Sequence, residues 1–181
     1  MHLKHLVATA LTLPLTLLSA SESEPDKKCF FEQVGIHGAA DDENGINIKG
    51  AEVYGIISTS WDWDLSEAMH IDLKFKTSLG AWDSDDETTA LIHFAPQLRL
   101  HYKDFPVYLS GSVGPTFISE DEPEDGHEMG GFFQFTSSIG IHWEITERFE
   151  IGYDYQHTSN AGIYSDNDGL NMHAFTAAYS F

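Results

Sequence analysis

Cysteine, basic residues and long apolar runs are all scarce in this sequence, and each scarcity excludes a class of structure. The single cysteine, Cys29, cannot form an internal disulfide bond. Only 9 lysine and arginine residues stand against 29 aspartate and glutamate residues, so the formal net charge is −20. Binding to nucleic-acid phosphates needs clustered basic side chains, and this composition therefore excludes a nucleic-acid-binding protein.

No segment after the N-terminal leader approaches about 18 consecutive apolar residues, so the sequence predicts no transmembrane helix. The leader has a weakly basic start with Lys4, an apolar run over residues 6–18, and small residues at its end. This is the pattern of a secretory signal peptide. We therefore expect residues 1–20 to be cleaved after Ala20 and residues 21–181 to form one exported domain.

The sequence is rich in short segments in which apolar and polar residues alternate. In one of them Ile71, Leu73 and Phe75 alternate with Asp72 and Lys74, as in a strand with one apolar and one polar face. We predict eight strands, at about residues 31–40, 49–61, 71–81, 90–102, 107–117, 133–143, 149–159 and a last strand that ends at Phe181.

The even number of strands and the connections between them favour a membrane barrel. Short turns follow the second, fourth and sixth strands, longer polar loops follow the first, fifth and seventh, and aromatic residues fall near strand ends. We therefore predict an all-β fold, an eight-stranded antiparallel up-and-down transmembrane β-barrel of the outer-membrane type. A soluble β-sandwich is the alternative, but it has no reason for loop asymmetry or for aromatic residues at both rims.

The strand assignment makes two further structural predictions. Pro96 and Pro115 fall inside strands and lack a backbone donor, so we expect bulges or local kinks there. The polar faces should form an interior network in the lumen, with these members: His93, Arg99, His142, Asp72, Lys74 and Glu144.

The strand at 149–159 carries the residues with the clearest chemistry. His157 and Ser159 share its apolar face, which would face lipid near the outer rim of the barrel. Asn171 on the next strand has the same phase and can approach His157. A hydroxyl, an imidazole and a group that orients the imidazole are the parts of a hydrolase site. A histidine and a serine at this spacing often occur by chance, but polar residues on a lipid-facing wall are costly unless they have a use.

Two hydrogen-bond donors lie just beyond this strand. The side chain of Asn160 could donate to a developing oxyanion, and the backbone N–H of Gly162 could supply a second donor.

The carboxylates gather in the predicted outer loops. The favoured interpretation is that these carboxylates are simply solvated in the loops. The more specific alternative is that they bind divalent cations, which bridge them to lipid phosphates. His127 lies within the acidic stretch 124–128, but that stretch lacks a defined coordination spacing, so we expect no metal site there.

The C-terminal part of the chain resembles a known family, the lipid A 3-O-deacylases of the PagL type. The resemblance is carried by His157-Thr-Ser-Asn-Ala-Gly162, by Asn167-Asp-Gly-Leu-Asn171 and by an aromatic last strand. It implies an eight-stranded barrel in the bacterial outer membrane, with a serine esterase site on its outer wall and lipid A or lipopolysaccharide as substrate.

The resemblance also implies a role for each residue of the site. Ser159 would be the nucleophile, His157 the general base, and Asn160 with the Gly162 amide the oxyanion hole. The reaction would release the 3-O-linked hydroxyacyl chain of lipid A by ester hydrolysis, with no metal or other cofactor.

One departure from the family pattern concerns the residue that orients the histidine. The family has a glutamate on the last strand, and the equivalent position here is Asn171. An asparagine can orient a histidine but stabilises an imidazolium less, and Asp166 or Asp168 from the preceding loop could serve instead.

Two other functions therefore stay open. One is a degenerate, slow deacylase, and the other is a non-enzymatic small barrel that serves adhesion or surface stability. The working form, monomer or homodimer, is open as well.

Overall fold

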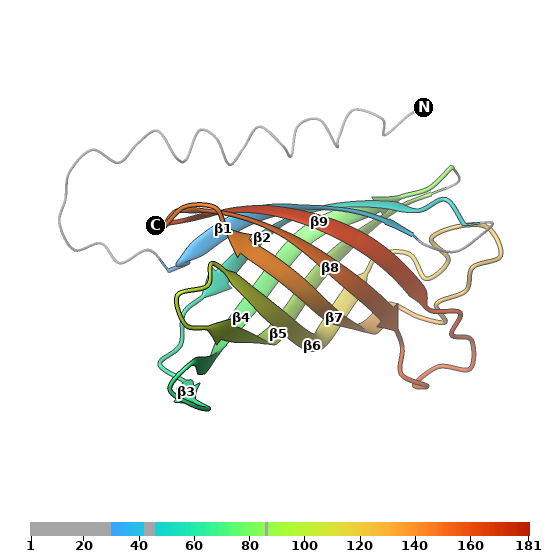
Figure 1. Cartoon of the computed structure of the whole chain (residues 1–181). Helices are drawn as coiled ribbons and strands as arrows, with labels where there is room; N and C mark the ends of the chain where they lie inside the picture. Colours follow the sequence, from blue (N-terminus) through green and yellow to red (C-terminus); the bar gives the residue numbers. More distant parts are fainter. Residues whose placement is uncertain (1–29, 42–45, 86) are drawn as a thin grey trace.

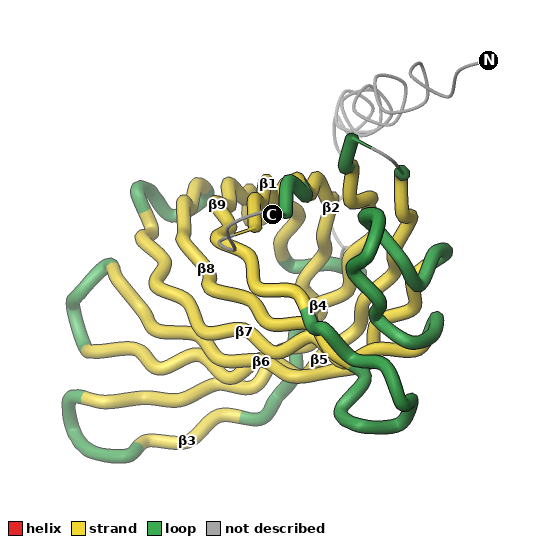
Figure 2. Tube along the Cα trace, turned by 90° about the vertical axis from the view of Figure 1, so that its right-hand side faces the viewer, coloured by secondary structure: helices red, strands yellow, loops and turns green. Residues whose placement is uncertain are grey.

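The computed structural model describes residues 30–41, 46–85 and 87–181, and within them the chain forms nine β-strands (Figures 1 and 2). The predicted signal peptide and Cys29 lie outside the described residues. The strands are β1 (Gln33–Asp41), β2 (Lys49–Ile57), β3 (Asp62–Asp64), β4 (Met69–Asp83), β5 (Thr88–Tyr102), β6 (Val107–Ile118), β7 (Phe133–Glu144), β8 (Phe149–Ser159) and β9 (Leu170–Ser180). The described residues contain no helix long and apolar enough to cross a membrane.

Eight of these strands close into an antiparallel barrel, which confirms the predicted fold class. Neighbouring strands follow the order β2-β1-β9-β8-β7-β6-β5-β4, and pairing of β2 with β4 closes the ring. The remaining strand, β3, is not part of this ring: it pairs with β4 and projects beyond the barrel wall (Figure 1).

The second strand is shorter than the predicted 49–61, because a bulge interrupts its pairing with β4. The last pair of β2 joins Ile57 to Phe75, and the first pair of β3 joins Asp62 to Asp72. Residues 58–61 therefore oppose only residues 73 and 74. The two extra residues form a bulge, and β3 resumes the pairing on its far side.

The polarity of the two faces of the barrel wall is the reverse of that in a soluble protein, with apolar side chains outside and polar side chains inside. Large apolar side chains on the outer face have exposed fractions of 44–69%: Ile36, Leu79, Ile92, Phe94, Leu98, Leu109, Val113, Phe117, Ile139, Ile141, Ile151 and Phe175. Polar and charged side chains are buried in the lumen: His37, Lys76, His93, Gln97, Arg99, Gln134, His142, Glu150 and Asp154. An apolar outer band around a polar interior is the arrangement of an outer-membrane barrel.

The lumen holds the interior polar network predicted for His142 and Arg99. The Glu150 carboxylate accepts hydrogen bonds from Tyr108 Oη (2.8 Å) and Gln33 Nε2 (3.1 Å), and it lies 3.2 Å from His142 Nδ1. The Arg99 guanidinium donates to Gln33 Oε1 (3.1 Å). The hydrogen bonds join strands that are not neighbours in the ring, namely β6 with β8, β1 with β8 and β5 with β1, so they brace the barrel from within.

The remaining predicted members of the network line the same lumen. His93 is buried and lies 2.9 Å from Thr116 Oγ1, Asp72 is bonded to His101, and Lys74 is bonded to Glu32. Glu144 is exposed because β7 ends at this residue, and it lines the mouth of the lumen together with Asp72 and Arg99.

The two prolines interrupt the ladder between β5 and β6 without a bulge. Pairing stops after His93–Thr116 and resumes at Gln97–Ser112 with the register unchanged. Pro96 and Pro115 both fall in this gap, where their missing N–H groups would have left ladder bonds unmade. The expected bulges are therefore absent from this pair of strands, and a local break in pairing takes their place. The strands β5 and β6 also approach closely here, since a Cβ atom at Gly114 would collide with the backbone carbonyl of Phe94.

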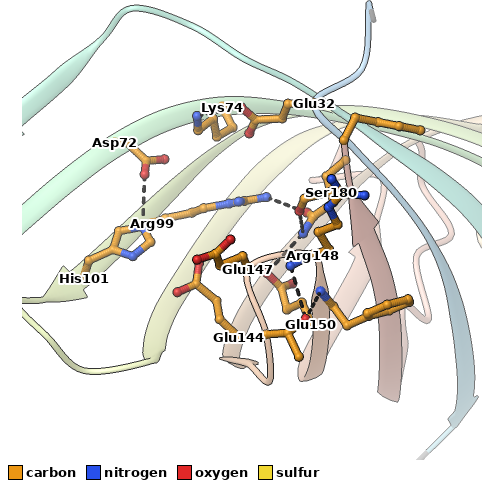
Figure 3. A pocket seen from close by; sticks show the side chains of 14 residues that line it. Glu32, Asp72, Lys74, Arg99, His101, Glu144, Glu147, Arg148, Glu150 and Ser180 are labelled. Carbon is orange, nitrogen blue, oxygen red and sulfur yellow. Dashed lines mark hydrogen bonds and ion pairs between the residues drawn. The ribbon is translucent and has the colours of Figure 1, made fainter. Parts of the chain in front are cut away.

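The two ends of the barrel differ. Short turns follow β5 and β7 as predicted, whereas the connection after β2 spans residues 58–68, contains β3 and is not the predicted short turn. The first strand of the barrel begins, and the last strand finishes, at the same rim, here called the terminal end (Figure 1). There a cavity of about 310 Å³ opens among charged side chains that include Lys74, Arg99, Arg148 and Glu150 (Figure 3). The opposite end, here called the loop end, carries the connections 119–132 and 160–169.

Candidate active site

The predicted histidine and serine form a hydrogen bond at the loop end of β8. Alternation along the strand puts both side chains on the lipid-facing wall, and His157 Nε2 lies 3.1 Å from Ser159 Oγ. The imidazole is exposed and the serine is half-buried. A hydroxyl within hydrogen-bond reach of an imidazole is the arrangement of a nucleophile with its general base.

Asn171 on β9 holds the other side of the imidazole. The strand register pairs His157 with Asn171, and His157 Nδ1 lies 2.8 Å from Asn171 Oδ1. An amide oxygen only accepts, so the shared proton lies on Nδ1. The other nitrogen, Nε2, is then unprotonated and is the acceptor for the Ser159 hydroxyl. This tautomer is the one that a general base needs.

The two aspartates that were alternatives to Asn171 have other partners. The Asp166 carboxylate accepts from Ser165 Oγ (3.0 Å), and the Asp168 carboxylate accepts from the Glu128 backbone N–H (2.8 Å). The structure therefore brings Asn171 to the imidazole rather than a carboxylate.

Gly169 makes room for the imidazole at the start of β9. A Cβ atom at this position would lie 3.2 Å from His157 Cε1, and the residue has φ +70°, where side chains other than hydrogen are strained. The glycine before Leu170 thus lets the loop return directly beside the site.

Asn160 is fully buried and organises the loop 160–169. Its side-chain N–H groups donate to the carbonyls of Met129 (2.9 Å) and Asp166 (2.6 Å), and its Oδ1 accepts from the Gly162 N–H (2.8 Å). The first of these bonds ties the loop to the preceding loop, 119–132. Both donors predicted for the oxyanion hole are thus bonded within the protein, so that role requires an exchange of partners when substrate binds.

Sequence reasoning overlooked two polar residues on the same wall. Ser137 on β7 is paired with His157, and its hydroxyl lies 3.4 Å from the His157 carbonyl. His173 on β9 has the same phase as Asn171, and its Nδ1 lies 2.5 Å from Tyr153 Oη. Strict period-2 counting along these strands would have found both. We call Ser137, His157, Ser159, Asn171 and His173 the polar patch.

The described residues contain no group of three or more histidine, cysteine, aspartate and glutamate side chains that could hold a metal ion.

Comparison with known proteins gives one family and one fold. A family model described as lipid A 3-O-deacylase (PagL) matches residues 50–180. The lipid A deacylase PagL of Bordetella bronchiseptica is 36% identical over 74 residues, an alignment that covers 41% of this chain and 41% of that protein.

Solved structures agree in fold at low sequence identity. The crystal structure of the outer membrane enzyme PagL superimposes with a TM-score of 0.73 at 15% identity, covering 82% of this chain and 99% of that chain. The N-terminal β-barrel domain of Pseudomonas aeruginosa OprF gives a TM-score of 0.53 at 12% identity, covering 83% of this chain and 98% of that one.

Proposed function

Because this chain belongs to the lipid A 3-O-deacylase (PagL) family, we propose that it is a serine esterase of the outer membrane that removes the 3-O-linked acyl chain of lipid A. One observation carries the proposal: the hydrogen-bonded series Ser159–His157–Asn171 on the lipid-facing wall. A membrane lipid can reach this wall by lateral diffusion, and its ester lies at the level of the loop end.

The reaction begins with Ser159. Its oxygen attacks the carbonyl carbon of the ester while His157 Nε2 takes the hydroxyl proton. The tetrahedral intermediate collapses as the imidazolium returns that proton to the sugar oxygen, which leaves as an alcohol. A water molecule then attacks the acyl-serine, with His157 again as base, and the free fatty acid departs.

Asn171 positions the imidazole but does not neutralise its charge. A carboxylate at this position would stabilise the imidazolium formed in each step, and a neutral amide provides only the dipole of its oxygen. The expected enzyme is therefore correctly assembled but slower than one with an acidic third residue.

The oxyanion would be stabilised by the Asn160 side chain and the Gly162 amide. Asn160 is held by the Met129 and Asp166 carbonyls, and Gly162 by Asn160 itself. Asn160 follows Ser159 directly and Gly162 lies three residues after it, so an ester oxygen bound beside Ser159 would compete for their N–H groups.

The test is mass spectrometry of purified lipopolysaccharide after incubation with the refolded barrel and, in parallel, with Ser159→Ala. Loss of one ester-linked acyl chain that is absent in the variant supports the esterase. Unchanged lipid A with a correctly folded barrel would instead favour a non-enzymatic surface role. Cross-linking in membranes would show separately whether the working form is a monomer or a homodimer.

A further inference from the structure

The hairpin formed by β3 and the start of β4, here called the β3 hairpin, projects beyond the terminal end of the barrel (Figures 1 and 2). The pairing of β1 with β2 stops at the pair Gln33–Ile56, before β3 begins. Among the described strands β3 therefore has β4 as its one neighbour. The hairpin lies outside the closed ring, and its role is not explained by closure of the barrel.

Hydrogen bonds from two hydroxyl side chains fix the shape of the β3 hairpin. In the turn, Ser66 Oγ accepts a hydrogen bond from the Met69 backbone N–H (3.1 Å). At the bulge, Thr59 Oγ1 donates to the Leu73 carbonyl and accepts from the Trp61 backbone N–H (3.1 Å). Because the backbone is held at both places, the side chains of the hairpin project in defined directions.

One face of the β3 hairpin is apolar and continues the lipid-facing wall. Trp63 is paired with Ile71, Ile71 is paired with Leu100, and paired residues project from the same face of a sheet. Alternation along the chain adds further side chains to this face. The large apolar side chains of the hairpin that share it are 36–57% exposed: Trp61, Trp63, Leu65 and Met69.

The other face of the β3 hairpin is acidic. Asp62 and Asp64 are exposed on it, and Asp64 Oδ1 lies 3.3 Å from His70 Nδ1. A strand with one aromatic and one acidic face suits a boundary between an apolar layer and water. Short length and charged side chains on the inward face are also features that prevent edge-to-edge pairing with another strand.

The apolar face lies at the level of the membrane–water interface. Met69 forms the last pair between β4 and β5 with Tyr102, at the terminal end of the wall. This end carries the short turns, which face the periplasm in barrels of this type. The headgroup layer of one leaflet is about 5–8 Å thick, and two residues of a strand span about 6.6 Å. A short hairpin at this rim therefore lies within the headgroup layer, where tryptophan is favoured.

We propose that the β3 hairpin is an interfacial anchor, whose apolar face contacts phospholipid in the headgroup layer of the periplasmic leaflet. Continuity identifies the occupant, because the lipid that covers Ile71 and Leu100 meets the paired Trp63 next. The carboxylates of Asp62 and Asp64 remain in periplasmic water. The anchor fixes the depth of the terminal end, and through the rigid barrel it fixes the depth of the loop end as well.

A second copy of the chain fits this face less well than lipid does. A stable protein interface needs roughly 20 residues on each side, whereas the hairpin supplies four large apolar side chains. Addition of a strand to β3 would meet a three-residue edge that carries two aspartates.

Tryptophan fluorescence tests the proposal, because the chain has four tryptophans and each can be kept alone. The full barrel with Trp61→Phe, Trp82→Phe and Trp143→Phe keeps Trp63 as its one emitter. It is refolded into phosphatidylcholine vesicles, with or without bromine on the acyl chains near the headgroup, and iodide is then added on both sides of the membrane. Brominated lipid should quench Trp63 strongly, and iodide should quench it weakly.

Two of the other tryptophans provide matched controls. A variant that keeps Trp143 alone reports the lipid-facing wall at the terminal end, where this side chain is 51% exposed, and brominated lipid should quench it by about the same fraction as Trp63. A variant that keeps Trp82 alone reports a buried side chain, 4% exposed, which should respond to neither quencher.

Two results would overturn the anchor. Strong quenching by iodide with no effect of brominated lipid would place the β3 hairpin in water. Protection of Trp63 from both quenchers, as expected for Trp82, would mean that protein covers the apolar face. Circular dichroism checks the folding of each variant. If a triple variant does not fold, the double variant Trp61→Phe, Trp63→Phe is compared with the unmodified barrel, and the emission it loses should be the part that brominated lipid quenches.

Discussion

The lipid-facing walls built by β4–β6 and by β7–β9 share one architecture but differ in chemistry. Along β4–β6 the outward phase is apolar except for Thr77 in mid-strand and polar or tyrosine residues at strand ends. Along β7–β9 the same phase carries the whole polar patch, all of it toward the loop end. Because the hydrocarbon layer penalises polar side chains equally on both walls at the same depth, their concentration on one wall indicates a function rather than chance.

The first way to break this contrast is to make the β7–β9 wall as apolar as its counterpart. His157→Phe should lower the esterase rate by about 10²–10⁴-fold, because the proposed general base is lost. The same change should leave the unfolding free energy of the barrel in lipid unchanged or raised, because a polar group leaves the wall. Initial rates on lipid A and denaturant unfolding in bilayers measure the two effects. A variant that loses stability as well as activity would show that the patch is structural.

The opposite change places a charge on the apolar wall. Phe94→Arg, near the middle of β5, should destabilise the barrel by about 2–4 kcal/mol, and Phe117→Arg, at the loop end of β6, by about 0–1 kcal/mol. Denaturant unfolding in bilayers gives both values. Equal costs at the two depths would mean that this wall does not face a hydrocarbon layer.

A third change sharpens the contrast by adding the charge that the polar patch lacks. Asn171→Glu should raise the rate of ester hydrolysis by about tenfold. A carboxylate beside the imidazole stabilises the imidazolium by a free energy that corresponds to about one or more pKa units. Asn171→Leu, which removes the acceptor from Nδ1, should lower the rate. Single-turnover measurements report the change directly. No gain with glutamate would indicate that positioning, not charge, limits the reaction.

The smallest expected effect concerns the loop above the patch. Asn160→Ala removes the hydrogen bonds to the Met129 and Asp166 carbonyls, which should lower the free energy needed to open the loop by about 1 kcal/mol. Protease should therefore cleave residues 160–169 a few-fold faster. Limited proteolysis of the barrel in detergent measures this. Asn167→Ala, which removes one acceptor for the Asn160 backbone N–H, is the milder control.

The sequence was informative where local rules decide the structure. His157 and Ser159 face the same way because a strand has a period of two, and Asn171 meets His157 because a hairpin fixes its register. The bulge at 58–61 and the partners of Asn160 were not predictable in this way. The first depends on how β2 and β4 match in length, and the second on a carbonyl in another loop, 31 residues away.

The place of the proposed reacting groups on the outer wall has a kinetic consequence. An enzyme with a pocket open to water meets its substrate in three dimensions, at a rate set by bulk concentration. Here the encounter takes place in the plane of one leaflet, so the rate should follow the mole fraction of substrate among the lipids. Adding inert lipid to the same vesicles would slow the enzyme, whereas diluting the vesicles in buffer would not.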